Sequence, residues 1–99
     1  MTQSIAFLET LYATILDRRA NSTPQESYVA KMAAAGLPRL AQKVGEEGVE
    51  TVIAAMKHDK AELCSESADL LFHLLMLWAE AGLTPAEVAA ELQRRHQPK

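Results

Sequence analysis

Acidic residues recur at helical spacing in the middle of the chain. Glu46, Glu47 and Glu50 form a Glu-Glu-x-x-Glu run. A second pair follows downstream, with Glu66 and Asp69 one helical turn apart. At ~100° per residue, the first run places its carboxylates within about a quarter of a helix circumference. Mg²⁺ prefers such oxygen ligands and keeps positions open for phosphate oxygens, so the spacing indicates metal-assisted chemistry on a phosphate compound.

The first acidic run also has a simpler interpretation, a solvated helix face. Lys43 lies one turn before Glu46 and Glu47. Ion pairs at this spacing stabilise a helix by only about 0.2–0.5 kcal/mol. The run alone does not separate the two interpretations, so the choice depends on the second acidic segment.

The second acidic segment belongs to a stretch that is otherwise apolar. When residues 59–81 are wound as a helix, the polar residues of interest fall within a wedge of ~60°. The wedge holds Glu62, Glu66, Asp69, His73 and Glu80. A helix that is apolar around the rest of its circumference is buried on most sides. Acids along its one polar strip therefore favour a metal site over plain solvation.

The two acidic segments are expected to face one another. A short break near residues 58–59 makes the flanking helices antiparallel neighbours. Facing residues in such a pair share a constant sum of residue numbers. Glu47 with Asp69 and Glu50 with Glu66 have the same sum. These carboxylates cannot all stay ionised without counter-charge, which leaves open more than one Mg²⁺ or one protonated acid.

Neighbouring side chains suggest further roles in hydrolysis. Glu46 or Glu47 could accept the proton of the attacking water. Lys43 and Lys57 could hold phosphate oxygens as point charges. His73 could contact a phosphate or could be a polar side chain satisfied within the fold.

Two glycines interrupt the first acidic helix. Gly45 and Gly48 each cost about 1 kcal/mol relative to Ala in a helix interior. Close packing against another helix is the expected reason, and room for a ligand is the alternative.

The elements that carry these residues are all predicted to be helices. Hydrophobic spacing and end signals place them at 4–19, 24–36, 38–58, 59–81 and 84–95. Thr23 and Thr84 each begin a capping-box pattern, Asp59 is a good N-cap, and Gly82 is a stop. We therefore expect one all-α domain over residues 1–99, with an antiparallel helical-bundle core.

Composition excludes several classes of protein. The formal net charge is −3 and no basic block is present, which argues against a nucleic-acid partner. The longest apolar stretch, 70–78, is broken by His73 and is far shorter than the ~20 residues that span a bilayer. The one cysteine, Cys64, is expected on the apolar side of its helix as a small hydrophobe. A single cysteine and no secretion signal predict a cytoplasmic protein.

Residues 59–81 form a helix that is apolar around most of its circumference, and we therefore expect the chain to oligomerise. Short helices in a chain of 99 residues could hardly cover that helix on all sides. We predict a homodimer with this helix at or near the interface.

Three segments resemble one enzyme family. They are Lys43–Glu50 (KVGEEGVE), Glu66–His73 (ESADLLFH) and the upstream Ser27–Lys31 (SYVAK). Together they resemble phosphoribosyl-ATP pyrophosphohydrolase, within the broader MazG-like all-α pyrophosphohydrolases. The resemblance extends from about Ile5 to Arg95.

The resemblance implies an activity and roles for residues. The expected reaction is cleavage of the α–β bond of 1-(5-phosphoribosyl)-ATP to phosphoribosyl-AMP and pyrophosphate, the second step of histidine biosynthesis. It implies Mg²⁺ and a homodimer. The implied metal ligands are Glu47, Glu50, Glu66 and Asp69, with Glu46 assisting. Tyr28 and Lys31 are implied to bind substrate together with Lys43, Lys57 and His73. Gly48 departs from the Ala expected in many relatives.

Other functions remain open at this stage. The nearest is a MazG-like enzyme acting on another nucleoside triphosphate, which would share the metal site. A di-iron or di-manganese bundle is disfavoured, because Asp69 stands where such sites use His. A helical interaction module without a metal is the remaining class.

Overall fold

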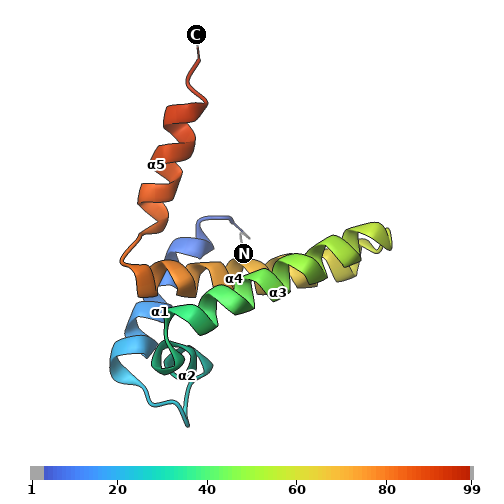
Figure 1. Cartoon of the computed structure of the whole chain (residues 1–99). Helices are drawn as coiled ribbons and strands as arrows, with labels where there is room; N and C mark the ends of the chain where they lie inside the picture. Colours follow the sequence, from blue (N-terminus) through green and yellow to red (C-terminus); the bar gives the residue numbers. More distant parts are fainter. Residues whose placement is uncertain (1–3, 99) are drawn as a thin grey trace.

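Helices joined by short turns account for the fold, with no strand among residues 4–98, which are the residues that the computed structural model describes. The helices are α1 (Phe7–Asn21), α2 (Tyr28–Ala35), α3 (Leu37–Met56), α4 (Lys60–Ala81) and α5 (Pro85–Arg95). Figure 1 shows their arrangement. The predicted all-α, five-helix fold is confirmed for this part of the chain.

Helices α3 and α4 form a long antiparallel hairpin whose closed end projects from the rest of the molecule (Figure 1). The turn begins at His58, which has a positive φ of 58°. The Asp59 side chain then accepts a hydrogen bond of 3.0 Å from the Glu62 backbone N–H and starts α4. At the other end, Gly82 is left-handed and ends α4, as expected.

The start of α2 differs from the sequence-based prediction. Thr23 accepts backbone hydrogen bonds of 3.0 Å from Glu26 and Ser27, which close one isolated turn. Ser27 is extended, and its hydroxyl accepts the Ala30 N–H at 3.2 Å. Thr23 is therefore not the cap of this helix. Ser27 takes that role because α2 must start there to bury Val29.

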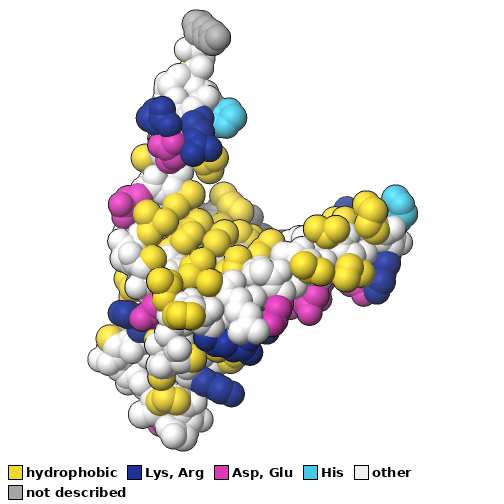
Figure 2. Space-filling view, viewed as in Figure 1, with side chains coloured by type: hydrophobic (Ala, Val, Ile, Leu, Met, Phe, Trp, Pro, Cys, Tyr) yellow, Lys and Arg dark blue, Asp and Glu magenta, His cyan; other side chains and the backbone are white. Residues whose placement is uncertain are grey.

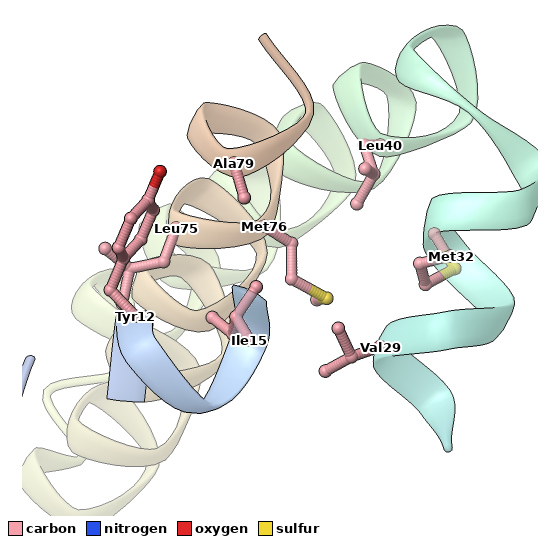
Figure 3. Close-up of a cluster of buried hydrophobic side chains, with 8 residues drawn as sticks. All are labelled: Tyr12, Ile15, Val29, Met32, Leu40, Leu75, Met76 and Ala79. Atoms are coloured by element: carbon pink, nitrogen blue, oxygen red, sulfur yellow. The ribbon is translucent and has the colours of Figure 1, made fainter. Parts of the chain in front are cut away.

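The hydrophobic core lies where α1 and α2 pack against α4 and the beginning of α3 (Figure 3). Its most deeply buried side chains are Ile15, Leu40 and Leu75, each no more than 2% exposed. Tyr12 lies at the edge of the core and donates a hydrogen bond of 2.8 Å to the Leu83 carbonyl. This bond ties α1 to the link between α4 and α5.

Much of the hairpin and most of α5 are exposed. No residue of α5 is buried, and Figure 1 shows this helix extending away from the others. Figure 2 shows hydrophobic side chains gathered near the base of α5 and along the projecting hairpin. Cys64, expected on a covered apolar side of α4, is exposed, because none of the residues 4–98 covers that part of the hairpin. No helix of the described residues is both long enough and apolar enough to span a membrane.

Candidate metal centre

Three carboxylates converge in the middle of the α3–α4 hairpin. Glu47 of α3 and Glu66 and Asp69 of α4 each offer an oxygen, and these oxygens lie within 4.8 Å of one another. Glu47 is buried, Glu66 is half-buried and Asp69 is exposed. The cluster therefore has a closed floor and an open side.

Thr51 fixes the position of α3 along its axis relative to α4. Its hydroxyl lies 2.8 Å from the Glu47 carbonyl, one turn back on its own helix, and 3.3 Å from the Glu66 carbonyl on α4. These two contacts of the Thr51 hydroxyl hold Glu47 beside Glu66. Sequence reasoning did not identify Thr51, although a β-branched polar residue one turn from Glu47 on the same face could have suggested it.

Two carboxylate oxygens of the cluster are buried without a partner. Glu47 Oε2 and Glu66 Oε2 accept no hydrogen bond from the described residues. Unpartnered buried oxygens are costly and rare in folded proteins. Their position in a group of three carboxylates fits a divalent cation that takes hard oxygen ligands, such as Mg²⁺.

Lys43 supplies part of the counter-charge. Its Nζ lies 3.4 Å from Glu47 Oε1 and 3.6 Å from Glu46 Oε1. Desolvation by burial lowers the pKa of Lys43. The hydrogen bond to Glu47 and the charges of Tyr28, Glu47 and Glu46 outweigh that effect and raise its pKa above the ordinary value. One lysine against three carboxylates leaves the cluster negative.

Glu50 lies beside the cluster and does not belong to it. A step of three residues turns its side chain ~60° away from Glu47 around the helix, because each residue advances ~100°. Glu50 instead lines a small hollow of about 140 Å³ with Ile53, Lys57, Glu62 and Glu66. Both predicted facing pairs are brought together: Glu47 with Asp69 in the cluster, which also includes Glu66, and Glu50 with Glu66 around the hollow.

Glu46 also lies outside the group of three. It is exposed, accepts a hydrogen bond of 3.2 Å from Gln42 and lies 3.9 Å from Arg39. Gln42 lies one turn and Arg39 two turns before Glu46 on α3. Glu46 is thus held next to the cluster by Lys43 and by its own helix.

The expected substrate-binding lysines differ in their surroundings. Lys57 borders the hollow and pairs with Glu62 at 3.3 Å. Lys31 is exposed on α2. Glu80, at the far end of the acidic wedge, pairs with Arg19 at 2.8 Å and so ties α4 to α1.

His73 is buried and has both ring nitrogens occupied. Nδ1 lies 2.8 Å from the Asp69 carbonyl, and Nε2 lies 2.7 Å from the Tyr28 hydroxyl. The expectation that His73 contacts a phosphate does not fit this geometry, because neither nitrogen is free. Its other interpretation, a polar side chain satisfied within the fold, does fit.

The glycines of α3 are not explained by packing within the chain. A Cβ added at Gly45 or Gly48 would meet no atom within 4 Å among the described residues. The expectation of close packing against a neighbouring helix is therefore wrong for this chain by itself.

Comparison with known proteins gives one family over nearly all of the chain. The family model described as phosphoribosyl-ATP pyrophosphohydrolase matches residues 8–96. A protein of Azospirillum brasilense named phosphoribosyl-ATP pyrophosphatase is 54% identical over 92 residues, which cover 93% of this chain and 82% of that protein. Its counterpart in Paramagnetospirillum magneticum is 53% identical over 95 residues, covering 96% of this chain and 86% of that protein.

A third relative combines this part with other sequence. The histidine biosynthesis bifunctional protein HisIE of Deinococcus radiodurans is 52% identical over 88 residues, which cover 89% of this chain and 40% of that protein. The chain described here, with its carboxylate cluster on an all-α hairpin, belongs to the phosphoribosyl-ATP pyrophosphohydrolase family.

Proposed function

We propose that the chain hydrolyses the α–β bond of 1-(5-phosphoribosyl)-ATP in histidine biosynthesis, with Mg²⁺ as its cofactor. The products are phosphoribosyl-AMP and pyrophosphate. The observation that carries the metal dependence is the pair of unpartnered buried oxygens within the three-carboxylate cluster. The substrate is supported by relatives that are named for it and are more than half identical to this chain.

Glu47, Glu66 and Asp69 would hold the metal ion. All of their donors are carboxylate oxygens, and one face of the cluster is open to solvent through the exposed Asp69. Bound there, Mg²⁺ would neutralise charge on the phosphate oxygens and lower the pKa of a water molecule. Glu50 borders the same site through the hollow that it shares with Glu66 and is available to balance the charge of a second cation.

The remaining residues would position the triphosphate and move the proton. Lys43 faces the cluster and would hold a phosphate oxygen as a point charge. Lys57 would do so from the hollow. Tyr28, which contacts His73 from α2, and Lys31, which is exposed on the same helix, are the residues that we propose to bind the rest of the nucleotide. Water oxygen forms a new bond to phosphorus as the bridging P–O bond breaks. Glu46 or Glu47 would take the proton from that water.

Turnover of several nucleotides tests the substrate. Purified protein with Mg²⁺ is incubated with phosphoribosyl-ATP and, separately, with ATP and a panel of other ribo- and deoxyribonucleoside triphosphates. We expect pyrophosphate release from phosphoribosyl-ATP to exceed release from every other compound by kcat/KM. Preferred hydrolysis of another triphosphate would support the alternative MazG-like function, and no release from phosphoribosyl-ATP would overturn the proposal.

We also propose that the enzyme is a homodimer built on the outer face of the hairpin. Val49, Val52 and Met56 of α3 are 61%, 62% and 70% exposed. At ~100° per residue they lie on the same side of α3 as Gly45 and Gly48, opposite the face that contacts α4. A second copy would cover this apolar strip and explain the two glycines, where an added Cβ would meet no atom of the described residues within 4 Å.

The cytoplasm is the compartment in which we expect this enzyme to act. Its one cysteine, Cys64, is exposed and free, and an exposed thiol persists in a reducing compartment. Fractionation of cells that produce the protein, with an antibody against it, tests this placement.

A further inference from the structure

The hydrogen bonds of His73 have a defined direction. A carbonyl oxygen only accepts, so the Nδ1 atom that faces the Asp69 carbonyl must carry the hydrogen. In the neutral ring, Nε2 then has a free lone pair. The Tyr28 hydroxyl therefore donates to Nε2 across their 2.7 Å contact. Asp69 orients the ring of His73, and that ring orients Tyr28.

His73 and Tyr28 differ in how much of each side chain is exposed to solvent. His73 is 6% exposed, whereas Tyr28 is 44% exposed. The Tyr28 ring meets the edge of His73 at a centroid distance of 5.6 Å and an interplanar angle of 84°. Phe72 lies against Tyr28 at 6.1 Å. Tyr28 is thus fixed from the protein side and keeps part of its ring open to solvent.

This pair of residues lies next to the groups proposed to bind phosphate. His73 is one helical turn from Asp69. Tyr28 begins α2, and its hydroxyl reaches α4 at His73, 2.7 Å from Nε2. Tyr28 therefore lies within one side chain of the helical turn that carries Asp69, at the border of the proposed site.

We infer that His73 is a positioning residue: its buried ring fixes the Tyr28 hydroxyl, and the exposed face of Tyr28 contacts the nucleotide substrate. The inference rests on the proposed function. It replaces direct contact between His73 and a phosphate with action through Tyr28.

Three variants separate positioning from direct contact. Tyr28→Phe removes only the hydroxyl. His73→Asn retains a donor near the place of Nδ1 and loses the acceptor for Tyr28. His73→Gln brings an amide oxygen to the place of Nε2 and restores that acceptor. His96→Asn, at the exposed residue that follows α5, is the matched control.

Steady-state kinetics with phosphoribosyl-ATP and saturating Mg²⁺ give the primary result. We expect Tyr28→Phe and His73→Asn each to raise KM by about 3–10-fold with kcat changed by no more than about 2-fold, as for loss of one hydrogen bond. His73→Gln should recover most of the change, and the Tyr28→Phe/His73→Asn double variant should match Tyr28→Phe alone.

Several results would overturn the inference. Multiplying effects in the double variant mean that His73 acts independently of Tyr28. A fall in kcat at unchanged KM means that the variants only reduce the folded fraction. An inactive wild type contradicts the proposed function instead, and the inference is then decided by nitrogen-15 spectra of the His73 ring. Those spectra should show hydrogen on Nδ1 and a changed Nε2 signal in Tyr28→Phe; hydrogen on Nε2 would overturn it.

Discussion

The carboxylate of Glu66 is expected to affect both the stability of the fold and the binding of a cation. One of its carboxylate oxygens is buried without a partner, beside Glu47, whose own Oε2 is in the same condition. Like charges held this close oppose folding in the absence of a cation. The arrangement is unfavourable for the empty protein and favourable once a cation joins the carboxylates, which is typical of a binding site.

Glu66→Gln should therefore separate the two effects. We expect the metal-free variant to be more stable than wild type by about 1 kcal/mol, because a buried like charge is removed and the new amide can donate to Glu47. Activity should fall more than about 100-fold, since residues that merely support a ligand already cost 10–100-fold. Urea unfolding with a chelator and turnover with Mg²⁺ measure these changes. Glu9→Gln, exposed on α1, is the control.

Unchanged activity in Glu66→Gln would remove this residue from the metal site. Unchanged stability together with lost activity would mean that the repulsion between Glu66 and Glu47 is smaller than their geometry implies.

At the level of helices, periodicity predicted the elements and part of the site. It placed Glu47 opposite Asp69 because both lie on the facing sides of a tight hairpin. It also placed Glu50 opposite Glu66, and the two residues line one hollow, although Glu50 lies outside the group of three carboxylates. The bond from Tyr28 to His73 joins residues from separate helices, and no local pattern encodes it.

The competing caps of α2 give a direct comparison. Both Thr23 and Ser27 carry side chains suited to an N-cap, and only Ser27 caps the helix. Ser27→Ala should lower the free energy of unfolding by about 1 kcal/mol, and Thr23→Ala by a few tenths, since loss of a cap costs about 0.5–2 kcal/mol. Urea denaturation of both variants measures the difference. An equal or larger loss in Thr23→Ala would contradict this assignment of α2.

Gly48 gives a second test at the scale of the helix. Because a Cβ there would meet nothing within 4 Å in the described chain, Gly48→Ala should raise the stability of the monomeric fold by about 0.5–1 kcal/mol. The measurement is unfolding under dilute conditions where the chain is monomeric. Destabilisation would show that another part of the same chain packs against this position in solution.

The whole molecule leaves more apolar surface uncovered than its own helices can bury. Exposed hydrophobic side chains lie on the outer face of α3, and Figure 2 shows others gathered near the base of α5, of which no residue is buried. A second copy with the same surface is the simplest cover, because a symmetric pair uses one surface twice.

Val52→Asp tests this assembly. We expect wild type to sediment as a dimer at micromolar concentration and Val52→Asp to sediment as a monomer, because a charge would be buried at the centre of the interface. Thr10→Asp, exposed on α1, should remain dimeric. A monomeric wild type, or a variant that still dimerises, would contradict an interface on this face of α3.

Crystallography of the protein soaked with Mn²⁺ in place of Mg²⁺ locates the cation. We expect an anomalous difference peak in the α3–α4 hairpin, with oxygens of Glu47, Glu66 and Asp69 about 2.1 Å away. An empty cluster in crystals of protein whose activity requires the metal, or a peak held by other residues, would contradict it.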